Sequence, residues 1–164
     1  MYIPASFVER DPSRILAIMR ESPLATVIAG GPEPQVGQAP TLVSEHGGIV
    51  SIEFHLAVNN PLCELLPDGS SCLILHTGPN CYVSPSWYAR HPSVPTWNYV
   101  SVEARGLVRR LNSEELADQV TELSRIHEQR VGGSWEYDGL PVEFQQKMLQ
   151  GICGFRVTAT QLEA

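Results

Sequence analysis

Short segments in which apolar and polar residues alternate recur along the chain, and this alternation is typical of half-buried β-strands. Near the C-terminus, Phe155, Val157 and Ala159 alternate with polar residues. The same pattern, or a short run of β-branched residues, predicts further strands over 24–29, 36–43, 49–54, 72–76, 96–105 and 107–111. Pro40 predicts a sheet edge or a bulge, and Gly106 predicts a bulge or a close approach of another strand.

Three other segments carry helical periodicity. Asp11 and Pro12 favour a helix start, because Asp is a good N-cap and Pro suits the first helical position. Asn112 with Glu115 forms a variant of the capping box and predicts a second start. A shorter helix is expected to begin near Pro141. Pro23, Gly132–Gly133 and Gly151 are the expected ends of these three helices.

These elements predict a mainly β (α+β) fold. Six or seven strands follow one another in an order that suits antiparallel pairing, and the simplest architecture is a small barrel with three helices packed around it. The chain has 164 residues and contains no repeat, low-complexity tract or clear linker, so we expect one domain over residues 1–164.

The stretch 78–99 departs from the usual composition of a loop. It holds five of the twelve aromatic residues and four of the thirteen prolines. Each proline restricts the backbone, so the rings of this stretch have few arrangements open to them. Stiff rings beside hydroxyl and amide groups suit a flat ligand with polar edges. The alternative is an aromatic mini-core beneath a long loop.

A second candidate site is the segment from His55 to Pro61. A histidine at the end of a strand, followed by Asn59, Asn60 and a proline, is typical of a loop that carries a binding site. The same residues could instead cap turns, since Asn is common in turns.

Charge and composition narrow the function classes. The net charge of −7 does not favour direct binding to nucleic acid or to an anionic membrane. No apolar run reaches the roughly 20 residues of a membrane span, and no secretory signal is evident, so we expect a cytoplasmic protein.

The sequence lacks the common motifs of metal sites and of several enzyme classes. The four cysteines form no Cys-x-x-Cys pair, so we expect reduced, mostly buried thiols. Phosphate-binding glycine loops, zinc-protease motifs and a serine nucleophile elbow are also missing from the sequence.

The string Gly78-Pro79-x-x-Tyr82-Val83-Ser84-Pro85-Ser86-Trp87-Tyr88, followed by Val94-Pro95-Thr96-Trp97-Asn98-Tyr99, resembles the signature of the PaiB family of FMN-binding negative transcriptional regulators. His55-x-Ala57-x-x-Asn60-Pro61 is similar to part of that family's His-x-Ala-Arg-x-Asn-Pro loop. The opening residues and the region around Met148 to Phe155 extend the resemblance over almost the whole chain.

The resemblance implies a split β-barrel, a homodimer, and a flavin mononucleotide (FMN) site at the dimer interface. By resemblance, His55 and Asn60 would line the cofactor cleft. One wall would come from Ser86, Trp87 and Tyr88, and a second wall from Thr96, Trp97 and Asn98.

The sequence also departs from the family pattern. Val58 stands where the family usually has Arg, Gln38-Ala39-Pro40 stands for its His-x-Pro, and the sequence ends at Glu163-Ala164 without a Lys-x-Ser-Gln-Asn tail. The phosphate of FMN requires cationic or helix N-terminal partners. Arg105, Arg90 and Arg109 are the candidate substitutes.

Three functions therefore stay open. The first is a PaiB-like, flavin-binding transcriptional regulator that acts as a homodimer. The second is a haem- or flavin-dependent enzyme resembling piperazate synthase, which forms an N–N bond. In that case His55 is the leading haem ligand, and His76, His91 and Cys81 are lesser candidates. The third is a degenerate barrel without cofactor that binds other proteins.

Overall fold

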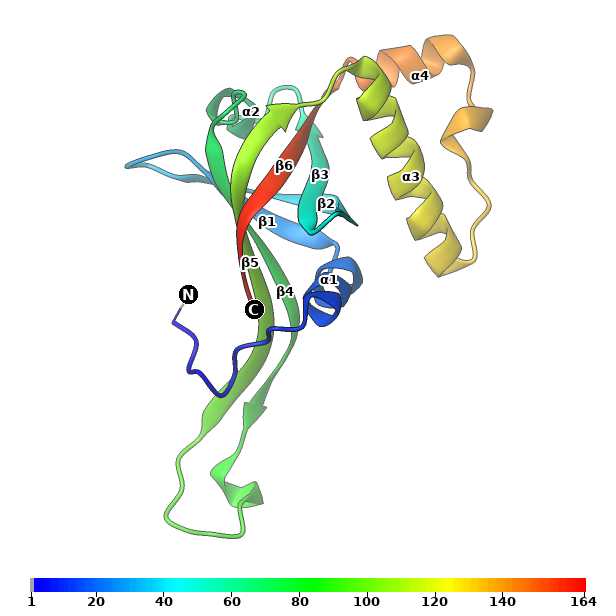
Figure 1. Cartoon of the computed structure of the whole chain (residues 1–164). Helices are drawn as coiled ribbons and strands as arrows, with labels where there is room; N and C mark the ends of the chain where they lie inside the picture. Colours follow the sequence, from blue (N-terminus) through cyan, green and yellow to red (C-terminus); the bar gives the residue numbers. More distant parts are fainter. Residues whose placement is uncertain (1) are drawn as a thin grey trace.

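The computed structural model describes residues 2–164, and six strands within them form one closed barrel (Figure 1). The strands are β1 (Leu24–Ala29), β2 (Gln35–His46), β3 (Ile49–Ala57), β4 (Ser71–Val83), β5 (Thr96–Arg110) and β6 (Ile152–Glu163). Their order around the barrel is β1-β2-β3-β6-β5-β4, and every neighbouring pair is antiparallel. The predicted mainly β barrel is therefore confirmed.

The helices begin where the sequence indicates. They are α1 (Pro12–Glu21), the short α2 (Leu62–Leu65), α3 (Ser113–Val131) and α4 (Val142–Leu149). The carboxylate of Asp11 accepts a hydrogen bond from the backbone N–H of Ser13 at 2.9 Å. Asn112 and Glu115 form both halves of a capping box at the start of α3. None of the helices within residues 2–164 has the length and apolar character that crossing a bilayer requires.

The inside of the barrel is filled by apolar side chains. The rings of Phe54 and Phe155 stack with their centroids 5.4 Å apart, and both rings are fully buried. Around them lie further side chains with no exposed area, among them Ile52, Ile74, Val102 and Val157. Met19 of α1 is also fully buried against this cluster. Residues that bind a ligand must therefore lie on the outer face of the barrel or beyond its ends.

The sequence predicts an edge or an irregularity of the sheet at two residues, Gly106 and Pro40. The pairing of β5 with β6 shifts between Arg105 and Gly106, which confirms the bulge expected at this glycine. Pro40 lies at a local edge of the sheet, as expected, because residues 35–40 of β2 pair with β1 on one side and with no strand on the other. It is the last residue of β2 that pairs with β1, and β2 pairs with β3 from Thr41 onward. Pro40 thus occupies the corner where β2 changes partner.

The strands β4 and β5 continue beyond the barrel as a two-stranded arm, residues 78–99 (Figure 1). Pairing in the arm runs from Asn80 opposite Tyr99 to Val83 opposite Thr96. A short 3-10 turn, Pro85–Trp87, follows β4 at the far end. β4 is consequently longer than its expected range of 72–76, since it includes the first part of the aromatic stretch.

Candidate functional site

His55 lies on the outer face of β3, beneath α3. Its neighbours Phe54 and Leu56 point into the barrel, whereas His55 is half-buried on the opposite face. Its Nδ1 lies 2.9 Å from Oε1 of Gln119, a residue of α3 that is only 1% exposed. If the amide oxygen accepts, His55 carries its proton on Nδ1, and its Nε2 keeps a free lone pair.

Asn60 caps the turn between β3 and α2. Its backbone N–H donates to the carbonyl of Ala57 at 2.8 Å, and its Oδ1 accepts from the backbone N–H of Leu62 at 3.0 Å. The bond to Oδ1 is a local capping bond, as expected for Asn in a turn. The predicted cofactor contact of Asn60 stays a prediction.

The other six predicted site residues all lie on the arm, and none of them is buried: Ser86, Trp87, Tyr88, Thr96, Trp97 and Asn98. Trp97 is 56% exposed, although its Nε1 donates to Oδ1 of Asn80 at 3.2 Å. Trp87 is 71% exposed. The rings therefore form no mini-core, and they are free to contact another molecule.

One chain does not bring the two halves of the predicted site together. Trp97 and Arg110 are thirteen residues apart on β5, which corresponds to about 40 Å of strand. Arg110 pairs with Phe155, and His55 pairs with Gly154, so His55 lies at the end of the barrel far from the arm. Residues of the arm can meet a site near His55 only when they come from a second chain.

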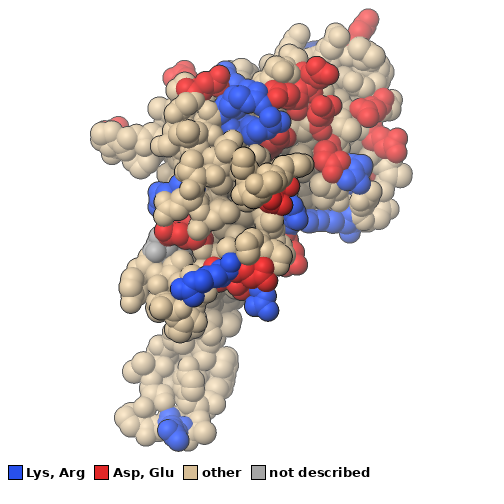
Figure 2. Space-filling view, viewed as in Figure 1, with Lys and Arg blue, Asp and Glu red and all other residues tan. Residues whose placement is uncertain are grey.

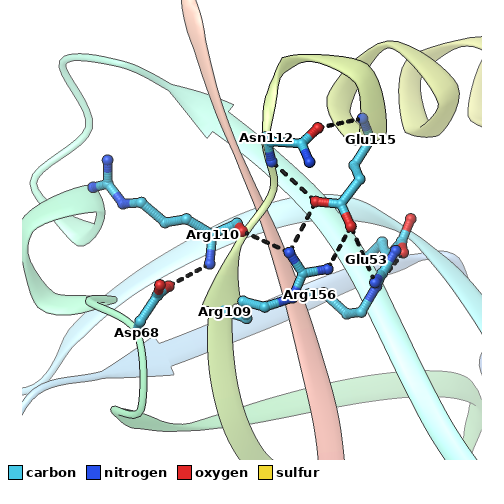
Figure 3. Close-up of polar contacts among 7 residues, drawn as sticks. All are labelled: Glu53, Asp68, Arg109, Arg110, Asn112, Glu115 and Arg156. Carbon is cyan, nitrogen blue, oxygen red and sulfur yellow. Dashed lines mark hydrogen bonds and ion pairs between the residues drawn. The ribbon is translucent and has the colours of Figure 1, made fainter.

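A network of ion pairs fixes α3 to the barrel above β3 and β6 (Figure 3). Arg109 donates two hydrogen bonds to Glu115, at 2.6 and 2.8 Å. Arg156 donates to Glu53 at 2.6 Å and to Glu115 at 3.4 Å. The hydrogen bonds from Arg109, with that from the backbone of Asn112, lower the pKa of Glu115 to about 2.

This network changes the choice of phosphate partners. Arg109 is saturated by Glu115, and Arg105 pairs with Glu103 at 3.1 Å. Arg90 is the only charged residue of the arm, whose surface in Figure 2 is otherwise almost free of charge. Of the three arginines considered from the sequence, none faces His55 with its charge unpaired.

The lesser haem-ligand candidates are also placed by the structure. His76 is fully buried, and its Nδ1 donates to the carbonyl of Ser22 at 2.9 Å. His91 and Cys81 lie exposed on the arm. Cys63 and Cys72 are buried free thiols, and burial raises the pKa of Cys72 to about 12.

A groove of about 410 Å³ separates α3 from β2 and β3. Pro23, Leu42, Val43 and Ile126 supply apolar walls, and Gln119 lies at its inner side. Arg20, from the end of α1, and Arg130, from the end of α3, line the same groove. The groove thus combines apolar surface, an amide and two guanidinium groups, and its lining also includes Arg156 and four carboxylates.

No motif in the sequence marks Arg20, Arg130 or Gln119 as a site residue. A signal existed for Gln119 alone, because it lies three residues after Leu116 and four before Leu123, both of which are buried. A polar residue on the apolar face of a helix needs a buried partner. The two arginines come from helices far apart in the sequence, so only the fold brings them together.

Comparison with known proteins gives the same fold. The chain is 28% identical over 165 residues to protease synthase and sporulation protein PAI 2 of Bacillus subtilis (strain 168), covering 100% of this chain and 79% of that protein. The flavocytochrome Anf3 from Azotobacter vinelandii superposes with a TM-score of 0.67 at 17% identity, covering 99% of this chain and 71% of the other. The FAD and heme binding protein from Mycobacterium smegmatis superposes with a TM-score of 0.68 at 14% identity, covering 95% and 71%.

A family model described as "Putative FMN-binding domain" matches residues 1–161. The match covers nearly all 164 residues, and it includes both the His55 segment and the aromatic arm. The chain therefore belongs to this FMN-binding domain family and is a homologue of PAI 2, the PaiB protein.

Proposed function

We propose that the protein is a flavin mononucleotide-binding regulator that acts as a homodimer. Membership of the FMN-binding family supports the ligand class. The observation that carries the proposal is the exposed, almost uncharged aromatic arm, whose residues belong to the expected flavin site but lie far from His55 in the same chain. Such an apolar, ring-bearing surface is typical of sites that another molecule covers.

This separation supports the dimer. An arm that extends beyond its own barrel can lie against the barrel of a partner and place Trp87 and Trp97 near the partner's outer face. Each chain would then supply the face around His55 for one site and the arm for the other. The bound FMN would supply redox chemistry through its isoalloxazine ring.

The regulatory part of the proposal rests on the homology to PAI 2, a protease synthase and sporulation protein. The net charge of −7 does not favour a regulator that binds DNA directly. We therefore place the regulation in an interaction with another macromolecule that responds to the bound ligand.

A second candidate is haem binding, and the contact between His55 and Gln119 favours it. A histidine that ligates a metal usually donates its other ring N–H to an oxygen acceptor, which orients the ring. Gln119 is such an acceptor at 2.9 Å from Nδ1. The haem-binding protein among the structural relatives has the same fold.

One preparation tests both candidates. The absorption spectrum of the purified protein should show flavin bands, and added FMN should bind with quenching of its fluorescence. Light scattering after size-exclusion chromatography should give a mass twice that of one chain, which is 18.1 kDa. A Soret band that His55→Ala abolishes would favour haem instead. A monomer that binds neither group would refute the proposal.

A further inference from the structure

Arg20 and Arg130 both line the groove between α3 and strands β2 and β3. Arg20 donates from Nε to the carbonyl of Val43 at 3.1 Å, and Arg130 donates to the carbonyl of Arg20 at 2.6 Å. These bonds use backbone acceptors only. Within residues 2–164 neither arginine has a carboxylate within 4.0 Å, so both positive charges are unpaired there.

The other charges of the groove are largely compensated. The carboxylates of Glu53, Glu115 and Glu122 each pair with an arginine, at 2.6 Å. Asp118 also lines the groove, where it is exposed and has no ion pair within residues 2–164. In a chain with a net charge of −7, two arginines that line one groove without a carboxylate partner are a candidate site for an anion.

Gln119 supplies a second, independent indication of a ligand. Its side chain is 1% exposed, and its Oε1 is used by His55. Its Nε2 is buried and has no hydrogen-bond partner in the structure. A buried donor of this kind is unfavourable unless an acceptor satisfies it. A carbonyl oxygen at the edge of a ring ligand in the groove would supply that acceptor.

The walls of the groove fit the rest of such a ligand. Pro23, Leu42, Val43 and Ile126 offer apolar surface in the groove that the two arginines and Gln119 also line. A volume of about 410 Å³ lies within the usual range for sites that hold small molecules and cofactors.

We infer that Arg20 and Arg130 bind the phosphate of a planar ligand of the FMN type, with Gln119 donating to the polar edge of its ring. This inference rests on the proposed function and names the residues for it. The two arginines would also supply the positive charge that the family pattern usually has at the position of Val58. The groove selects a phosphorylated ligand over its unphosphorylated form, because a guanidinium binds phosphate with charge-assisted, bidentate hydrogen bonds.

The test compares FMN with riboflavin, which lacks the phosphate. The double variant Arg20→Gln/Arg130→Gln should bind FMN roughly 10- to 100-fold more weakly than the wild type. Its affinity for riboflavin should be unchanged, which also shows that the variant is folded. The charge-preserving variant Arg20→Lys/Arg130→Lys should keep most of the preference for FMN. Fluorescence titration of each flavin gives both affinities.

Arg110→Gln is the matched control. Arg110 is exposed, has no ion pair within residues 2–164, and lines a second cavity of about 510 Å³. Its guanidinium donates to the carbonyl of Cys63 at 2.6 Å and lies over the ring of Phe155. This variant should bind FMN as the wild type does.

The outcomes separate this inference from the proposed function. If the wild type prefers FMN and the double variant keeps that preference, the assignment of Arg20 and Arg130 is wrong while flavin binding stands. If only Arg110→Gln loses affinity for FMN, the phosphate binds in the second cavity, and the assignment to Arg20 and Arg130 is wrong. A wild type that binds neither flavin ends the proposed function, and this inference with it.

Discussion

The Nδ1 atom of His55 lies 2.9 Å from Oε1 of Gln119, and this contact joins the outer face of β3 to the buried side of α3. The two residues are 64 positions apart in the chain. Because the amide oxygen accepts, the contact selects the Nδ1–H tautomer of His55. The orientation of the imidazole and the state of its Nε2 therefore depend on a residue of another element.

Replacing Gln119 by Leu should remove the preference of His55 for the Nδ1–H tautomer. The substitution removes the acceptor, so the ¹⁵N shifts of the His55 ring should change from those of the Nδ1–H form toward a mixture of tautomers. The free energy of unfolding should fall by about 1 kcal/mol, since one buried hydrogen bond is lost. Gln119→Glu, which keeps an acceptor, should retain the Nδ1–H form. Unchanged ring shifts in the Leu variant would contradict the contact.

Gly106 should not tolerate a side chain. A Cβ at this position would overlap the carbonyl oxygen of Thr158 and lie 2.7 Å from Cγ1 of Val157, at the bulge between β5 and β6. We expect Gly106→Ala to destabilise the protein by about 1–3 kcal/mol. Gly31→Ala is the control, because nothing lies within 4 Å of its Cβ. Urea unfolding measures both, and equal midpoints would refute the close approach.

The accuracy of the sequence predictions depends on how local each signal is. The caps at Asp11 and Asn112 were predicted correctly, because the residues that form each cap are at most three positions apart. Gly106 was also predicted correctly, since a glycine inside a strand pattern usually marks a bulge or a close backbone approach. The edge expected at Pro40 is confirmed as well, although only the fold shows that this edge lies at the corner where β2 changes partner.

The arm and the groove depend on contacts between distant residues. Gly78 and Pro79 interrupt the alternation of β4, and the strand continues past them because β5 pairs with it on the far side. The sequence predicted His55 as a site residue but not its partner, Gln119. The aromatic residues were predicted to form a site, yet only the fold shows that about 40 Å of strand β5 separates them from the His55 end of the barrel.

Glu115 should make the stability of the protein sensitive to acid. Its hydrogen bonds from Arg109 lower its pKa from 4.5 to about 2. The stabilisation is therefore complete above about pH 4.5 and is lost as the pH falls toward 2. Glu115→Gln preserves the capping-box geometry without the charge. It should be less stable than the wild type at pH 7, and the difference should shrink between pH 4.5 and 2.5 in urea unfolding curves. A constant difference would contradict the low pKa.

His76 should contribute a second pH dependence at milder acidity. Burial lowers the pKa of His76, although its hydrogen bond to the Ser22 carbonyl opposes this effect. The folded protein then holds a neutral imidazole where the unfolded chain binds a proton, so stability present above about pH 6.5 is lost as the pH falls below it. His76→Gln should flatten this part of the profile. His46→Gln, at an exposed position, should leave it unchanged.

The exposed arm should determine whether the protein dimerises. Trp87 is 71% exposed and Val94 is 78% exposed, and neither packs in the barrel core. Replacing both by Ser removes apolar contact area from the proposed interface and leaves the fold intact. We expect Trp87→Ser/Val94→Ser to shift the mass from dimer to monomer at micromolar concentration, while its far-ultraviolet circular dichroism stays that of the wild type. Val131→Ser, which is 79% exposed at the end of α3, should remain dimeric. An arm variant that stays dimeric would place the interface elsewhere, and the arm residues would then not reach a partner's site.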